Sequence, residues 1–121
     1  MSLLGARLVS VSAGEVVIQL NHREDLVQQN GFLHAGVTTA VIDSACAYAA
    51  LTMMPEDREV LSVEFKVNLL APAAGTRFRA VGKVVKAGRT LTVCQGEMIA
   101  QDSGKCVAIM TATMYGVVPT P

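Results

Sequence analysis

A single carboxylate lies within a long run of small and apolar residues. Residues 30–51 read NGFLHAGVTTAVIDSACAYAAL, and Asp43 is the one acidic residue in that run. An aspartate in such a place can serve as a general base or as a nucleophile. The run predicts a helix that begins near His34, and the free N–H groups at its start carry the positive end of the helix dipole. The N–H groups of Ala35 and Gly36 can therefore stabilise an oxyanion.

Spacing along this helix limits how the two chemical groups can cooperate. Nine residues separate His34 from Asp43, which turns the helix through roughly 900° and leaves the two side chains on opposite sides. They cannot act on one substrate within one copy of the helix. A site that uses both must therefore include a second chain.

Each candidate residue also has a purely structural explanation. Asp43 could face solvent, and His34 could bond a nearby carbonyl at the helix start. Ser62 alternates with polar residues and reads as an ordinary strand serine. Lys86 and Arg89 flank a turn, where charge usually means solvation. Taken singly, none of these residues identifies a site.

The elements that must position these residues follow from periodicity and turn signals. The run from Leu33 to Met54 predicts one long helix, which Pro55 ends. Its expected small-residue face holds Asp43, and a bulkier stripe is expected to pack on a sheet. That face comprises Gly36, Thr39, Ala40, Asp43, Ala47 and Ala50, and the stripe comprises Val37, Val41 and Tyr48.

Strands are predicted on both sides of the helix. ARLVSVS and EVVIQLN form a hairpin before it, and four β-rich runs follow it at 59–73, 76–86, 91–101 and 105–117. In the first of these four, strict alternation predicts one face with Leu61, Val63, Phe65, Val67 and Leu69, and another with Ser62, Glu64, Lys66 and Asn68. We expect a four-strand meander. The whole chain, 1–121, reads as one α+β domain in which an antiparallel sheet wraps around one long helix.

Composition narrows the function classes. Lys and Arg together number 10, as do Asp and Glu, so no charge bias points to nucleic acid or to a membrane surface. Charged residues are 17% of the chain, below the roughly 25% of average proteins, and apolar residues are 51%. A small domain of this kind commonly hides apolar surface against another copy of itself. We expect an oligomer.

Metal, disulfide and membrane roles are not favoured. Three cysteines without ligand spacing and two histidines predict reduced thiols, no metal site and a cytoplasmic protein. The first residues lack the long apolar core of a signal peptide. Residues 30–51 approach the length of a membrane span, but small residues dominate them, and Asp43 at the centre would cost about 2.5–3.5 kcal/mol.

Taken together, the motifs resemble a known family. The run GFLHAGVTTAVIDSA resembles the signature of the hotdog-fold acyl-CoA thioesterases, and most closely of the phenylacetate-pathway (PaaI-like) group, whose helix opens with His-Gly-Gly and carries an Asp further along. LSVEFKVNLLAPA, VVKAGRTL and the DSGK hairpin are similar to later parts of the same family. The resemblance implies the hotdog fold, a homo-oligomer that is at least a dimer and commonly a tetramer, and active sites between subunits. It also implies an acyl-CoA substrate, with coenzyme A as part of the substrate and no separate cofactor.

The resemblance also implies a role for each matching residue. Asp43 is the expected base or nucleophile, and the N–H of Ala35 polarises the thioester carbonyl. His34 is expected to brace the loop and the thioester, and Gln28 to position the water or the carbonyl. Ser62 is expected to place a hydroxyl near the attacking water. The turn with Lys86, Gly88 and Arg89 is expected to bind the phosphates of coenzyme A.

One departure from the family pattern keeps alternatives open. Ala35 stands where the family has the first glycine after the histidine. The backbone N–H survives this change, but the methyl group would crowd the thioester, or shift the turn if the position requires a positive φ. A non-catalytic acyl-CoA-binding protein is therefore the alternative to a thioesterase. A hydratase on the same fold is disfavoured, since no histidine follows Asp43, and a purely structural module would bind no coenzyme A.

Overall fold

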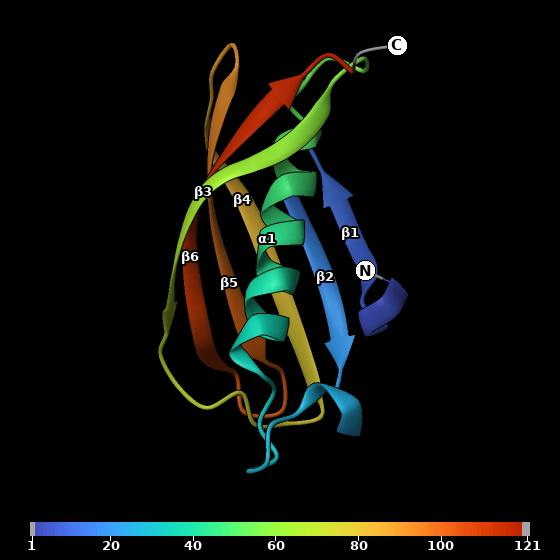
Figure 1. The fold of residues 1–121 in the computed structure, drawn as a ribbon, viewed down its shortest axis with the longest axis vertical. Coiled ribbons are helices and arrows are strands. Elements are labelled where there is room, and N and C mark those ends of the chain that lie inside the picture. The colour runs from blue at the N-terminus through green and yellow to red at the C-terminus, as the bar shows by residue number, and fades with distance from the viewer. Residues whose placement is uncertain (1, 120–121) are drawn as a thin grey trace.

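The computed structural model describes residues 2–119, in which a six-stranded antiparallel sheet curls around one helix (Figure 1). This arrangement confirms the predicted fold class. The helix α1 spans Ala35–Leu51, and two short 3-10 turns, η1 and η2, span Ser2–Leu4 and Glu24–Leu26. The strands are β1 (Arg7–Ser12), β2 (Glu15–Asn21), β3 (Glu59–Leu69), β4 (Arg77–Ala87), β5 (Leu91–Ala100) and β6 (Lys105–Val117).

The helix α1 is rich in alanine, the strongest helix former, and is shorter at both ends than predicted. At its start, the N–H groups of Leu33 and His34 donate to the carbonyls of Ala73 and Leu26, outside the helix, so Leu33 and His34 belong to the loop before α1. At its end, the Thr52 hydroxyl donates to the Ala49 carbonyl and accepts the N–H of Gly14. The end of the helix is thereby tied to the β1–β2 turn before Pro55 is reached.

The predicted four-strand meander is wrong in one connection. The strand order is β1-β2-β4-β5-β6-β3, so β3 pairs with β6 and lies at an edge, while β4 pairs with β2. Residues 70–76 connect that edge strand to β4. The N–H of Leu70 donates a hydrogen bond to the carbonyl of Val107, which holds the start of this connection in place. Periodicity identifies a strand but does not say which strand lies beside it.

The predicted alternation of β3 is also wrong, because the strand contains a β-bulge. The pairing with β6 shifts between Ser62 and Glu64, which leaves Val63 as the extra residue. Ser62 lies opposite Met114 and Phe65 opposite Ala112, and both partners are buried residues of the core. Directly paired residues share a face, so Ser62 and Phe65 both point toward the helix. Strict alternation would have placed them on opposite faces.

The face of α1 that packs on the sheet differs from the predicted stripe. The buried residues are Thr38, Val41, Ile42, Ala45, Cys46, Ala49 and Ala50. Tyr48, expected on the sheet, is 42% exposed, and Ala50, expected beside Asp43, is fully buried. Val41 is fully buried as predicted, and Ile42 lies beside it on the same face. The rest of this face is mainly small residues, which let the helix lie very close to the strands.

Two glycines allow this close approach. Gly82 of β4 and Gly96 of β5 lie opposite each other in the sheet, directly beneath α1. A β-carbon at Gly82 would collide with the backbone carbonyl of Ala45 and come within 2.6 Å of the Cys46 nitrogen. At Gly96 it would meet side-chain atoms of Ile42 and Cys46 instead. The helix therefore rests on the bare backbone of the central strands.

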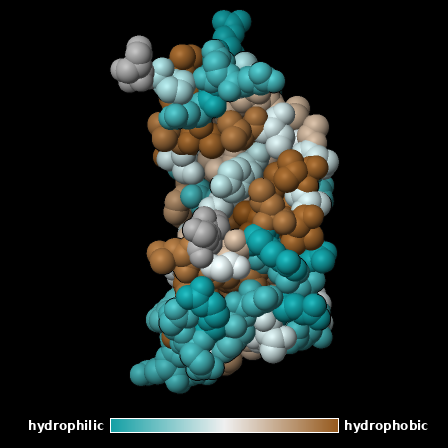
Figure 2. Space-filling model, turned by 90° about the vertical axis from the view of Figure 1, so that its right-hand side faces the viewer, coloured by the Kyte–Doolittle hydropathy of each residue, from teal (hydrophilic) through white to brown (hydrophobic). Residues whose placement is uncertain are grey.

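Both edge strands expose apolar side chains. On the side formed by the β1 edge, apolar groups gather in the upper half and the lower end is mostly hydrophilic (Figure 2). The exposed apolar residues of β1 are Leu8, Val9 and Val11, and those of β3 are Leu61, Val63, Phe65 and Leu69. Within residues 2–119, no helix has the length and apolar character needed to cross a membrane.

We predict that Gly82→Ala lowers the free energy of unfolding by about 3 kcal/mol or more, because helix and sheet backbones would have to separate. Gly96→Ala should cost only about 1–2 kcal/mol, since side-chain ends can shift aside. Urea unfolding at matched protein concentration measures both. Equal destabilisation by the two substitutions would contradict a backbone contact at Gly82.

Candidate active site

Asp43 and Ser62 form the polar centre of the exposed side of α1. Asp43 is half-buried in the middle of the helix, and its Oδ1 accepts a hydrogen bond of 2.8 Å from the Ser62 hydroxyl. The same hydroxyl lies 3.3 Å from the Met114 sulfur, but its single proton can serve only one acceptor at a time. Oδ2 of Asp43 has no hydrogen-bond partner within the described residues. One carboxylate oxygen is thus held, and the other is available to a substrate or a water.

The β-bulge makes this hydrogen bond possible. Ser62 reads as a solvent-facing strand residue, but the extra residue Val63 places it on the helix-facing side of β3. Ser62 is therefore brought to Asp43 and does not lie on the outer face of β3, while its expected role near an attacking water stays a prediction. The sequence signal that could have revealed the bulge is weak, because runs like LSVEF (residues 61–65) occur in regular strands too.

The start of α1 offers free backbone donors. The N–H groups of Ala35 and Gly36 have no acceptor within residues 2–119, and both residues are exposed. Ala35 is the first helical residue, and positive φ is confined to glycines in the described chain. Alanine therefore causes no backbone strain at this position.

A hollow of about 540 Å³ opens beside these donors and contains three of the predicted site residues. Its lining comprises Gln28, Phe32, Leu33, His34, Ala35, Thr38, Leu69, Leu70, Ala71, Pro72, Ala73 and Val107. The Oε1 of Gln28 accepts the N–H of Asn30, which leaves the Nε2 protons of the amide to donate elsewhere. The imidazole of His34 is exposed and forms no hydrogen bond within residues 2–119, so its expected bracing role stays a prediction.

Thr38 is a residue of this hollow that sequence reasoning did not single out. It lies one helical turn beyond Ala35 and is only 2% exposed. A threonine among small residues carries no special signal in a helix sequence. Its spacing of three from Ala35, which puts both on neighbouring positions of the helix surface, could have suggested it.

One chain does not bring the carboxylate and the helix start together. Asp43 lies eight residues after Ala35, which is about 12 Å along the helix axis. A thioester carbonyl bound at the N–H of Ala35 cannot reach Asp43 of the same chain. One chain therefore holds the predicted residues in two separate groups, which are the half-sites of the shared site proposed below: Asp43 with Ser62, and Gln28 and His34 with Ala35 and Gly36.

The expected phosphate-binding turn lies at the Asp43 end of the sheet. Lys86, Gly88 and Arg89 are exposed at the β4–β5 hairpin, at the top of Figure 1, whereas α1 starts at the bottom. Across the sheet, Ala87 pairs with Thr92, Thr92 with Met114, and Met114 with Ser62. Ser62 and this hairpin thus share one level of the sheet, three strand spacings or roughly 14 Å apart. The helix start of the same chain is at the other end.

The cysteines are poor nucleophiles in this fold. Burial raises the pKa of Cys46 to about 12 and that of Cys94 to about 11, and burial also raises the pKa of Cys106. All three are free thiols. Because the thiolate is the reactive form, these side chains stay protonated near neutral pH and leave Asp43 as the candidate nucleophile or base.

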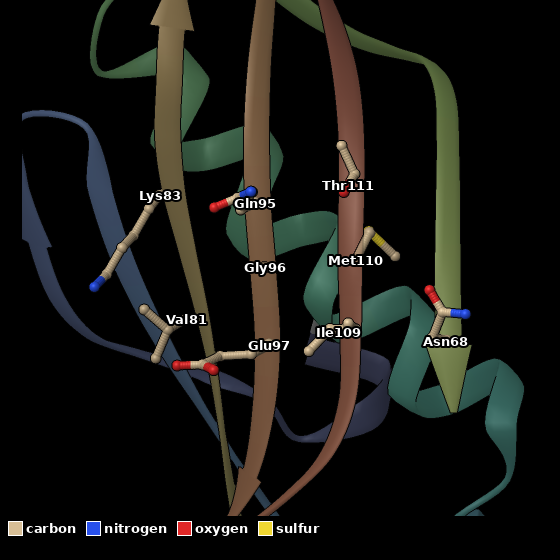
Figure 3. Close-up of a pocket in the computed structure, with 9 residues that line it drawn as sticks. All are labelled: Asn68, Val81, Lys83, Gln95, Gly96, Glu97, Ile109, Met110 and Thr111. Carbon is tan, nitrogen blue, oxygen red and sulfur yellow. The ribbon is translucent and has the colours of Figure 1, made fainter. Parts of the chain in front are cut away.

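A second hollow, of about 380 Å³, lies on the face of the sheet turned away from α1 (Figure 3). Lys83, Gln95, Glu97 and Thr111 of three neighbouring strands are among its lining residues, and α1 lies behind the sheet. None of the predicted site residues lines it. The buried core separates it from Asp43 and from the start of α1.

Sequence comparison relates this chain to thioesterases. Residues 30–107 match the family model described as the thioesterase superfamily. A 1,4-dihydroxy-2-naphthoyl-CoA hydrolase of Listeria monocytogenes is 27% identical over 111 residues, which cover 92% of this chain and 89% of that protein. Human acyl-coenzyme A thioesterase 13 is 26% identical over 102 residues, covering 84% of this chain and 72% of the relative.

Solved structures share the same fold. A thioesterase family protein from Silicibacter pomeroyi superposes with a TM-score of 0.95 at 46% identity, covering 98% of this chain and 89% of that one. A variant of the phenylacetic acid degradation protein PaaI from Thermus thermophilus gives 0.85 at 27% identity, covering 95% and 96%. With a matching family model over most of its length and a helix wrapped by the same curled sheet, the chain belongs to the thioesterase superfamily and is a hotdog-fold thioester hydrolase of the PaaI-like type.

Proposed function

We propose that the protein hydrolyses an acyl-CoA thioester to a free acid and coenzyme A, in a site shared between two copies of the chain. The observation that carries this proposal is the hydrogen bond from Ser62 to Asp43, which holds a carboxylate on the open side of α1. Asp43 of one chain would face the helix start of the other. Acyl-coenzyme A thioesterase 13 and the Listeria hydrolase are named for reactions of this kind.

The open edge of β3 supports a second copy beside the first. Phe65 and Leu69 point toward the helix side yet remain 45% and 55% exposed, and the outer edge of β3 has no strand partner within the described residues. An exposed apolar edge strand is a template for pairing with another chain. A twofold axis through this edge would run the two helices in opposite directions. The start of each helix would then lie near the middle of the other.

The chemistry assigns one role to each half-site. Oδ2 of Asp43 takes a proton from water, and the resulting hydroxide attacks the thioester carbon while the carbonyl oxygen gains negative charge. The N–H of Ala35 in the other chain stabilises that oxyanion. The carbon–sulfur bond then breaks, and the thiolate of coenzyme A receives the proton held by Asp43. In the nucleophilic variant, Oδ2 attacks the carbon directly, the carbon–sulfur bond breaks and the thiolate of coenzyme A leaves. Water then cleaves the resulting anhydride to the free acid and the Asp43 carboxylate, and its proton passes to the thiolate.

The surroundings suggest what the substrate looks like. The hollow at the start of α1 has mostly apolar walls and no Lys, Arg, Asp or Glu in its lining, which suits a small, medium-sized or aromatic uncharged acyl group. Lys86 and Arg89 would bind the coenzyme A phosphates with the backbone of Gly88. No separate cofactor or metal is needed for these steps.

We further propose that dimers pair into tetramers and that the enzyme works in the cytoplasm, where its three free thiols stay reduced.

The first prediction from this proposed function concerns the carboxylate. Asp43→Asn keeps the shape of the side chain but removes its basicity, so turnover of acyl-CoA should fall at least about 100-fold, and Asp43→Ala should abolish it. Release of coenzyme A, followed with a free-thiol reagent across a panel of acyl-CoAs, measures this. Asp57→Asn, on an exposed aspartate paired with Arg58, is the matched control and should retain full activity. An active Asp43→Ala enzyme with a normal melting temperature would rule the assignment out.

The second prediction isolates the oxyanion donor. Proline is tolerated at the first helical position, and His34 already has the extended backbone (φ −58°, ψ 140°) that a following proline requires. Ala35→Pro should therefore leave α1 intact while removing one N–H, and should lower kcat about 100- to 1,000-fold. Ala35→Gly keeps the N–H and should stay active. Wild-type kcat in the proline variant would exclude this N–H from the site.

The third prediction tests whether the site is shared. An Asp43→Asn chain paired with an Ala35→Pro chain forms one site with both defects and one with neither. Co-refolding equal amounts of the two inactive variants should thus restore about a quarter of wild-type activity, if chains pair at random as dimers. Differently tagged chains verify that mixed oligomers form. Mixed oligomers without recovered activity would mean that each site belongs to one chain.

A further inference from the structure

Three arginines gather on the face of the sheet that is turned away from α1. Arg7 of β1 pairs with Gln19 of β2, and Gln19 pairs in turn with Arg79 of β4. Arg77, two residues before Arg79, pairs with Asn21 of β2. Directly paired residues share a face and lie about 5 Å apart. These five side chains therefore form one cluster, which we call the arginine cluster.

The alternation of the strands holds this cluster outside the core. Phe78 and Ala80 flank Arg79 in β4 and are fully buried, and Gln19 is flanked by two buried residues of β2 in the same way. Successive side chains of a strand point to opposite faces of the sheet. The arginines consequently lie on the outer face, where all three are exposed.

No carboxylate forms an ion pair with these three arginines within residues 2–119. The ion pairs of that part of the chain involve other residues. Glu97 of β5 lies diagonally across from Arg79, because it pairs with Val81, but it makes no ion pair with Arg79. Asp102 lies near Arg77, but its oxygens already accept the backbone N–H and the hydroxyl of Thr76. Three positive charges are thus close together, which is unfavourable unless an anion joins them.

The polar groups of the arginine cluster are mainly hydrogen-bond donors. Each guanidinium carries five N–H donors and no acceptor. Gln19 is only 9% exposed, and its Nε2 donates to Oδ1 of Asn21 at 3.2 Å. That bond leaves the two Nδ2 protons of Asn21 to donate elsewhere. A ligand of this cluster must therefore accept hydrogen bonds and carry negative charge.

The spacing of the arginines favours a phosphate over a carboxylate. Arg7 and Arg79 lie on either side of Gln19, two strand spacings or roughly 10 Å apart at the backbone. Their long side chains can lean toward one another over Gln19. A carboxylate has two oxygens, which one arginine fork occupies, whereas a phosphate group offers three acceptor oxygens and can serve more than one fork.

We propose that Arg7, Arg77 and Arg79 bind the phosphate group of a small molecule, in a site separate from the thioester site. The arginine cluster lies on the other face of the sheet from Asp43, and β4 is three strand spacings, roughly 14 Å, from β3. Lys86 is seven residues beyond Arg79, or roughly 23 Å along β4. This site does not depend on the proposed function, because it needs no part of a bound acyl-CoA.

Calorimetric titration of the full-length protein at low ionic strength, in a buffer without oxyanions, tests this site. The probes are inorganic phosphate, AMP and adenosine, and wild type should bind a phosphate-bearing probe but not adenosine. Arg7→Gln and Arg79→Gln should each raise the dissociation constant about tenfold, since each removes charge-assisted hydrogen bonds. Arg58→Gln, on an arginine paired with Asp57, is the matched control and should bind as wild type does.

The two anionic probes distinguish the possible sources of the phosphate. Binding of AMP alone would assign the site to a phosphate ester, and binding of both would assign it to the phosphate group itself. Wild type that binds neither anion at millimolar concentration would overturn the proposal, as would equal binding by wild type and all variants. Adenosine that binds as tightly as AMP would do the same.

A second substitution guards against a loss of folding. If Arg79→Gln unfolds at a lower temperature than wild type, Arg79→Lys takes its place, because lysine keeps the charge and lacks the planar fork. Its dissociation constant should rise about threefold or more, and an unchanged constant would exclude Arg79 from the site. A protein that cleaves none of the acyl-CoAs would contradict the proposed function and leave this phosphate site standing.

Discussion

The contact between α1 and the bare backbone at Gly82 and Gly96 is the constraint on which the rest of the structure depends. Two glycines opposite each other in β4 and β5 let the helix approach more closely than any side chain would allow. The sheet can then curl around the helix, and the small residues Ala45 and Cys46 lie directly over the two glycines. Asp43, three positions before Cys46, is thereby held at the helix flank next to β3.

A local irregularity in β3 completes the arrangement. A regular strand would turn Ser62 away from the helix, and Asp43 would then lack its partner. The single extra residue Val63 restores the needed orientation without altering the apolar residues further along, since Phe65 and Val67 still face the core. A bulge disrupts the hydrogen bonds between the two strands locally. Bulges are nevertheless common where a side chain must be redirected. Here the redirected group is the hydroxyl that holds one oxygen of Asp43.

The length of the helix keeps apart the two groups that the proposed site needs. The donors at Ala35 and the carboxylate of Asp43 are about 12 Å apart along a rigid element, so no side-chain motion can join them. A second copy that pairs along the open edge of β3 is the simplest way to bring an Ala35 N–H and an Asp43 carboxylate together. The surface of that edge has the apolar character of a contact area. Association and catalysis would in this case depend on the same strand.

Residue types and periodicity by themselves determined the elements, the α+β class and the candidate residues of both half-sites, because helix and strand patterns are local properties of the chain. The His34-to-Asp43 spacing alone implied that one helix cannot unite them. Tertiary structure decided the features that depend on residues distant in sequence. These are the pairing of β3 with β6, the face of β3 on which Ser62 lies, the exposure of Tyr48 and the burial of Thr38. Each of these follows from a contact between residues distant in sequence, which a local pattern cannot encode.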